Sequence, residues 1–361
     1  MAAVHANLPR WSIAAPVFGW LALLLLGGAG WQSGVAAVAL IATVLAAVHH
    51  AEAVAHRIGE PFGTLVLAVS VTVIEVGLIL SLMLADNGSA PTLARDTVFA
   101  AVMIILNGLL GLCVLAGALR HREQSFTQSG VSASLAALAA LTVLPLVLPN
   151  YTTSAPGPTY TPQQLGFVAL VSLILYLTFV LVQTVRHRDY FLPEAAGGGT
   201  TDEEHAAPPS ARTALLAFAL LLVSLGAVIL LAKDLSPLFK QIASGAPAPD
   251  AIVGVLIAGV VLMPESLAAV RAARANRLQS SLNLALGSAL ATIGLTIPAV
   301  ALIALIFDLP LALGLGAKEI VLLALTLLVA TLSLGTGRTT ILQGAVHLVI
   351  FAVFLFVTVV P

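Results

Sequence analysis

The sequence predicts an all-α polytopic membrane protein with about 11 transmembrane helices, arranged as one N-terminal helix followed by two inverted repeats of five. The composition, the recurrence of apolar runs and the placement of basic residues support this. Of the 361 residues, 60% are hydrophobic and only 9% are charged, and the mean hydropathy is +1.08. A soluble domain carries about 25% charged residues. This chain cannot cover itself with a polar surface, and the lipid bilayer is its expected surrounding.

Apolar runs of about 20 residues recur along the chain, and each can cross roughly 30 Å of hydrocarbon. Because every backbone amide in lipid needs an internal partner, we expect these runs to be helices. They cover residues 12–28, 35–56, 62–84, 95–118, 130–148, 163–185, 213–243, 250–275, 280–306, 315–335 and 339–360.

One long polar segment, residues 186–212, contains a glycine triplet, an acidic run at 202–204 and a proline pair. That composition is typical of a flexible linker, here expected in the cytoplasm. The linker divides the chain into an N-terminal helix (1–30), a first repeat (35–185) and a second repeat (213–361). Five is an odd number, so two similar repeats would have opposite orientations, as in many secondary transporters.

Basic residues predict the orientation. With the N-terminus inside, 11 of the 15 lysines and arginines fall in inner loops and 4 in outer loops, which favours an inside N-terminus and an outside C-terminus. Basic residues form no aromatic-rich face, so nucleic acid is not an expected partner. The single cysteine, Cys113, lies in an apolar run, which excludes a disulfide framework.

Two carboxylates lie deep inside predicted spans, Glu75 in the third and Glu265 in the eighth. A carboxylate at this depth costs about 2.5–3.5 kcal/mol on insertion scales, so such a group usually binds a cation, pairs with a base or exchanges a proton. No lysine or arginine lies at comparable depth in any span. A purely structural ion pair is therefore the less favoured interpretation.

The spacing of acids strengthens this interpretation. Glu60 precedes Glu75 by 15 residues, and Asp250 precedes Glu265 by 15. With the five-plus-five pattern, this predicts an inverted duplication that brings Glu75 and Glu265 together near the midplane. Two carboxylates supply up to four oxygens, which suits a hard cation such as Ca²⁺. Low dielectric and mutual repulsion favour their protonated forms when no cation is bound, so protons and cations would compete for one metal site.

Other polar residues could complete that site. Pro264, directly before Glu265, removes a helix hydrogen bond and frees a backbone carbonyl. Hydrogen bonding between helices is the competing explanation for the hydroxyl candidates, and His347 in the last span is expected to have a structural role. The candidate supporting ligands are Ser70, Thr72, Asn107, Ser266, Ser288 and Thr292, and the candidate gating or access carboxylates are Glu52, Glu60 and Asp250.

Several stretches resemble the calcium/cation antiporter superfamily, and specifically the bacterial Cha-type branch of its cation/proton exchangers. They are Ile58 to Glu75, Arg122 to Phe126, Pro264 to Ser266, Leu284 to Leu290 and Gly337 to Thr340. The resemblance covers most of residues 35–360. It implies eleven spans, with spans 2–6 and 7–11 as the repeats, and a multi-pass protein of the bacterial inner membrane.

The resemblance also has departures. The family's repeats typically read Gly-Asn-Ala-x-Glu, often with a following histidine in the second. Here Thr72 and Leu262 replace the asparagines, and Ser266 replaces the histidine. Strict selectivity for Ca²⁺ is therefore in question, and Na⁺ or K⁺ becomes a credible substrate.

The leading hypothesis is Ca²⁺/H⁺ antiport that exports the cation, without a cofactor beyond the transported ions. Na⁺(K⁺)/H⁺ antiport through the same glutamates is the alternative. A membrane-embedded enzyme would need an Asp-rich motif pair, a Ser/His pair or an Asp/Asp pair, and none is visible. The sequence leaves the oligomeric state open.

Overall fold

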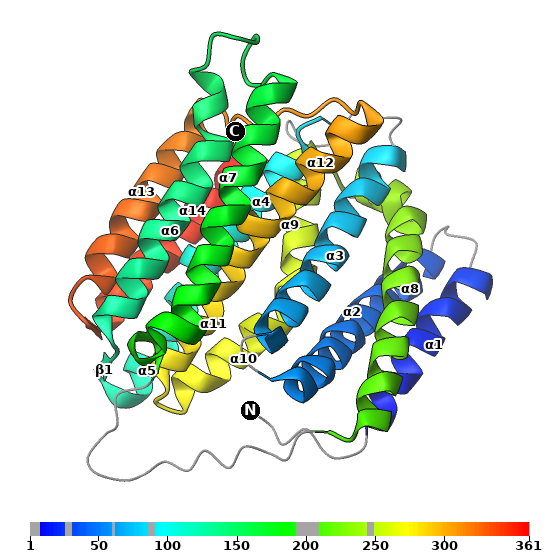
Figure 1. Cartoon of the computed structure of the whole chain (residues 1–361), viewed down its shortest axis with the longest axis horizontal. Coiled ribbons are helices and arrows are strands. Elements are labelled where there is room, and N and C mark those ends of the chain that lie inside the picture. The colour runs from blue at the N-terminus through cyan, green and yellow to red at the C-terminus, as the bar shows by residue number, and fades with distance from the viewer. Residues whose placement is uncertain are drawn as a thin grey trace. The chain divides into compact units, whose positions relative to one another are not determined.

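The computed structural model describes residues 8–25, 31–59, 62–85, 91–192, 209–243 and 249–360 (Figure 1). In these ranges the chain is almost entirely helical, and the only strands are the short β1 (Gln124–Ser125) and β2 (Arg338–Thr339). The described chain forms two compact units. Unit 1 takes its residues from Met1–Asn87 and Ala195–Gly245, and unit 2 from Gly88–Glu194 and Ala246–Pro361. Each unit thus combines segments from both predicted repeats.

Unit 1 consists of α1 (Arg10–Leu25), α2 (Trp31–Ile58), α3 (Phe62–Ala85) and α8 (Ala211–Ala243). A proline inside α1 explains one of its attachments. Pro16 has no N–H, which leaves the Ser12 carbonyl without its helical partner. His50 of α2 supplies one instead, with Nε2 2.9 Å from that oxygen. Helix α1 is also attached to α8, because the ring N–H of Trp20 donates to the Val223 carbonyl.

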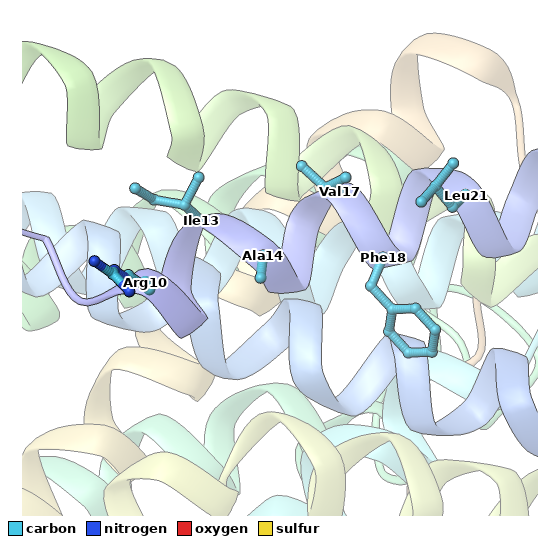
Figure 2. Close-up of a pocket in the computed structure, with 6 residues that line it drawn as sticks. All are labelled: Arg10, Ile13, Ala14, Val17, Phe18 and Leu21. Atoms are coloured by element: carbon cyan, nitrogen blue, oxygen red, sulfur yellow. The ribbon is translucent and has the colours of Figure 1, made fainter.

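The exposed face of α1 is apolar. Figure 2 shows a surface hollow along this helix, lined by Arg10 at its start and by five apolar residues, among them Val17, Phe18 and Leu21. Val17 and Leu21 are both exposed. An apolar face of this kind is what a helix in contact with lipid presents.

Unit 2 contains the remaining elements. They are α4 (Leu93–Met103), η1 (Ile104–Leu109), α5 (Leu110–His121), α6 (Gln128–Leu146), η2 (Leu148–Asn150), α7 (Pro162–Leu181), η3 (Val182–Arg186), η4 (Arg188–Phe191), α9 (Pro249–Val261), α10 (Met263–Arg274), α11 (Leu278–Ala291), η5 (Thr292–Thr296), α12 (Ile297–Phe307), α13 (Ala317–Leu334) and α14 (Ile341–Val359).

The prediction of an all-α polytopic membrane protein is confirmed. Among the described residues, nine helices are long and apolar enough to cross a membrane, and the α9–α10 pair, bent by 58°, would be a tenth. Helix α1 is apolar but has only 16 residues. All eleven predicted stretches contain a helix, while the number that cross the membrane and the inverted repeat stay predictions.

Two long helices of unit 2 are interrupted by π turns. The α4–η1–α5 helix contains η1, where the Leu110 amide bonds the carbonyl of Ile105, five residues earlier. The α11–η5–α12 helix contains η5. These are the third helices of the two predicted repeats, and α14 packs on η1 and α5 as α7 packs on η5 and α12. The matching arrangement is what an inverted repeat would produce.

Three connections meet at one end of unit 2, which we call the arginine-rich end: residues 122–127, 275–277 and 335–340. Strand β1, labelled at the lower left of Figure 1, pairs antiparallel with β2 there. His121 Nε2 lies 3.1 Å from the Arg274 carbonyl. Positively charged loops predicted to share one side of the membrane therefore lie together in space.

The predicted linker is not uniformly irregular. Its early residues form the short helix η4, whose Phe191 is buried with its ring centroid 5.9 Å from that of Phe179. The Phe191 carbonyl accepts a hydrogen bond from Asn283 Nδ2 at 2.5 Å. This part is thus packed on unit 2 because it supplies an apolar side chain to the core. The acidic run at 202–204 lies outside the described residues.

Candidate functional site

Glu75 lies in the middle of an otherwise uncharged helix. It is 2% exposed and follows Ile74, which is fully buried. Helix α3 runs on for 13 residues before Glu75 and 10 after it, or about 20 Å and 15 Å at 1.5 Å per residue. The carboxylate therefore lies far from either helix end, where water would solvate it.

Glu265 lies in a different backbone environment. It occupies the first turn of α10, three residues after Leu262, where the α9–α10 pair bends by 58°. Pro264 has no N–H to offer the Val260 carbonyl, so one backbone oxygen at the bend loses its helical partner. The first turn of a helix lies at the positive end of the helix dipole. This position favours a negative charge.

Along α10, Glu265 is 9 residues from Arg274, which corresponds to about 14 Å. That is close to half of the roughly 30 Å hydrocarbon thickness. Glu75 belongs to unit 1 and Glu265 to unit 2. The midplane location of the two carboxylates and their meeting both stay predictions.

Two hydroxyl candidates accompany Glu75 on α3. Ser70 and Thr72 are both buried, and their hydroxyls donate to the carbonyls of Val66 and Ala68 at 2.7 and 2.8 Å. Each oxygen keeps lone pairs for a cation. Thr72 is three residues from Glu75 and on the same side of the helix, whereas Ser70 is five residues away and points elsewhere. Thr72 is therefore the better placed of the two.

Asn107 is fully buried and engaged in a polar network. Its Nδ2 donates to Thr326 Oγ1 at 2.9 Å, and its Oδ1 lies 3.3 Å from His347 Nδ1. Within η1 the Leu110 amide bonds the Ile105 carbonyl, so the Leu106 carbonyl loses its usual helical partner. The network thus ties the π turn η1 to α13 and α14, and the contact of His347 with Asn107 supports the structural role expected for this histidine.

The remaining candidates are spread over unit 2 or lie near helix ends. Ser266 follows Glu265 and is half-buried, and Ser288 and Thr292 share one face of the α11–η5 segment. Asp250 lies in the first turn of α9. Glu52 is exposed on α2, and Glu60 lies outside the described residues.

Within the described parts of the chain, no group of three or more His, Cys, Asp or Glu side chains could hold a metal ion. A cation bound by the glutamates would therefore take its other oxygens from hydroxyls, backbone carbonyls and water. Sequence reasoning did not find the π turns or Thr326. A π turn leaves no distinctive residue pattern, and Thr326 is one of many threonines in apolar spans.

Comparisons with known proteins agree with this architecture. The sequence profile of the sodium/calcium exchanger protein family matches residues 28–185 and 216–360. The sodium-potassium/proton antiporter ChaA of Escherichia coli is 36% identical, covering 98% of this chain and 97% of its own. The Sinorhizobium fredii protein y4hA is 50% identical over 99% and 98% of the two chains.

Among solved structures, the Ca²⁺/H⁺ antiporter protein YfkE has the same fold. Its TM-score is 0.71 at 14% identity, and the match covers 98% of this chain and 99% of YfkE. Family and relatives are transporters and not enzymes. The chain therefore belongs to the sodium/calcium exchanger protein family, and it is a Cha-type member of the calcium/cation antiporter superfamily, as its motifs predict.

Proposed function

We propose that this chain exports a cation across the bacterial inner membrane in exchange for protons, with Glu75 and Glu265 forming one binding site that faces each side in turn. The observation that carries the proposal is the placement of these carboxylates. Glu75 lies at least 10 residues from either end of a helix with no other charged residue, and Glu265 lies at the α9–α10 bend, six residues before Arg271. A cation or protons bound at these side chains would neutralise their charge.

Charge balance favours Ca²⁺ as the cation. Two carboxylates carry two negative charges, which one Ca²⁺ or two protons neutralise completely, whereas one Na⁺ or K⁺ leaves a net negative charge in a low dielectric. Thr72, on the Glu75 side of α3, and the Val260 carbonyl at the bend are the favoured additional oxygens. Asn107 is better suited to positioning η1, because its amide already binds Thr326 and His347.

A second substrate class has its own support. ChaA, 36% identical over nearly the whole chain, is named a sodium-potassium/proton antiporter. The repeats of this chain also lack the asparagines typical of the family, at Thr72 and Leu262. Fewer fixed ligands would relax the demand for a divalent cation, so Na⁺(K⁺)/H⁺ exchange through the same glutamates is the alternative.

The test is exchange in proteoliposomes with a pH dye inside, after addition of Ca²⁺, Na⁺ or K⁺. We expect Glu75→Gln and Glu265→Gln each to lower exchange at least 100-fold, equivalent to about 2.7 kcal/mol. The matched control is Glu123→Gln, an exposed carboxylate whose oxygen is 3.7 Å from Arg338 Nη1, and it should change the rate less than about twofold. Exchange retained in both glutamate variants would refute the shared site. A response to Na⁺ and K⁺ alone would select the alternative substrate.

A further inference from the structure

Buried polar groups gather at the arginine-rich end of unit 2, around the pairing of β1 and β2. The central one is Gln124, which is 3% exposed. Its Nε2 donates to the Ala273 carbonyl and to Asn276 Oδ1, both at 2.9 Å. Its Oε1 is buried, and no described residue hydrogen-bonds it. The amide nitrogen of Gln124 therefore has hydrogen-bond partners, whereas its carbonyl oxygen has none among the described residues.

A second buried oxygen without a hydrogen-bond partner among the described residues lies on β2, opposite Gln124. Thr339 pairs with Gln124 in the β1–β2 register and is fully buried. Its Oγ1 also finds no hydrogen-bond partner in the described ranges. Paired residues of an antiparallel ribbon project their side chains to the same side. The two unsatisfied oxygens consequently share one region.

The polar region continues along α5. The Gln124 side chain sits directly on Gly117, where an added Cβ would collide with Oε1. One turn earlier on the same face lies Cys113, whose thiol is close to Ser281 of α11. Ser281 is fully buried, and no described residue hydrogen-bonds its hydroxyl. Thr339, Gln124, Cys113 and Ser281 thus form a polar strip along one face of α5.

The strip lies beside the helix that carries Glu265. Helix α10 packs on both α5 and α11, and Gln124 bonds the carbonyl of Ala273. Glu265, Ala269 and Ala273 follow at intervals of four and therefore share one face of α10. The two alanines are fully buried and small. From Ala273 to Glu265 the distance along the helix is 8 residues, or about 12 Å.

Unsatisfied polar atoms in protein interiors are costly, and ordered water usually satisfies them when several lie together. We propose that the polar strip binds ordered water and forms a hydrated path from the arginine-rich end towards Glu265. Under the proposed function, on which this role rests, the path is the route by which protons move between the cytoplasm and that carboxyl group. Thr339 and Gln124 form its outer end, and Ser281 lies further inside.

The only cysteine of the chain provides the probe. The S–H stretching band in an infrared spectrum reports on Cys113 alone, and exchange to S–D in heavy water reports whether water reaches it. In proteoliposomes we expect S–D to form within minutes. Thr339→Val should slow that exchange at least tenfold, and Thr339→Ser, which keeps the hydroxyl, should restore it.

The matched control is Ser172→Ala. Ser172 on α7 is a buried hydroxyl that likewise lacks a hydrogen-bond partner among the described residues, but it is outside the strip. This variant should exchange at the parent rate. An S–H band that persists for hours in the parent, or equal rates in the parent and Thr339→Val, would overturn the proposal.

This measurement does not depend on transport, so it can fail or succeed separately from the proposed function. Glu265→Gln should abolish cation exchange and leave S–D formation unchanged. Thr339→Val should slow proton-coupled cation exchange severalfold without changing the cation concentration for half-maximal rate. Normal transport with slow S–D formation would confine the water to a structural role and refute the path.

Discussion

Helix α3 and the α9–α10 pair each carry a glutamate inside a predicted membrane span, and another acid precedes each glutamate by 15 residues. The two segments differ in the course of their backbones. Helix α3 continues unbroken through Glu75, whereas the second segment bends by 58° three residues before Glu265. The difference follows from Pro264, which has no counterpart within α3. Glu265 consequently gains a helix N-terminus, and Glu75 has only side chains and ions to neutralise it.

Two halves of one predicted site can thus stabilise the same chemical group by different means. A negative charge at Glu265 is favoured by a fixed dipole, while a charge at Glu75 depends on what binds there. We therefore expect the two segments not to be interchangeable.

The largest expected effect comes from moving the proline to the unbroken helix. In Ile74→Pro the proline takes the place, relative to Glu75, that Pro264 has relative to Glu265. It should destabilise the protein by about 3 kcal/mol or more, because it removes a hydrogen bond in a fully buried turn. Thermal unfolding in detergent measures this.

The control for that substitution is Ile74→Val, which should cost only about 0.5–1.5 kcal/mol. If Ile74→Pro unfolds at the same temperature as Ile74→Val, α3 tolerates a break and the contrast between the segments fails.

An intermediate effect is expected from the reverse change. Pro264→Ala restores an N–H for the Val260 carbonyl and should reduce the bend between α9 and α10. We expect about a tenfold lower exchange rate, or about 1.4 kcal/mol, with little loss of stability. Spin labels on α9 and α10, in a Cys113→Ala background, measure the bend, and proteoliposomes measure the rate.

Pro145→Ala tests whether loss of any helix proline has this effect, because Pro145 lies inside α6. It should leave both the bend and the exchange rate close to parent values. A straightened α9–α10 pair that transports normally would show that the bend has no part in the site.

The smallest effect concerns the hydroxyls on α3. Thr72→Val removes an oxygen on the Glu75 side, and we expect it to raise the cation concentration for half-maximal exchange about threefold, or roughly 0.6 kcal/mol. Ser70→Ala, on another side of the same helix, should leave that concentration unchanged. Equal effects of the two substitutions would exclude Thr72 as a specific ligand.

Much of the architecture was predictable because it depends on local composition. A run of 20 apolar residues must be helical in lipid, and all eleven predicted stretches contain a helix. The helix break near Glu265 was also foreshadowed by Pro264. The packing of the early linker was not predictable. It depends on contacts of Phe191 with Phe179 and with Asn283, which lies 92 residues later in the sequence.

Within the candidate site, the chain alone indicated which carboxylates are exceptional, because a buried charge is costly wherever the helix lies. It also marked Asn107 and His347 as unusual polar residues. That Asn107 binds both Thr326 and His347 depends on contacts between helices more than 200 residues apart in the sequence.

Local chemistry by itself thus determined the membrane class and the helical segments, and it marked the two glutamates as candidates, because hydropathy and charge act residue by residue. Short motifs carried the family resemblance. Tertiary structure alone decided the grouping into two units, the π turns, the β1–β2 ribbon and the partners of the buried polar atoms. These features arise from packing between distant segments, and no short stretch of sequence encodes such contacts.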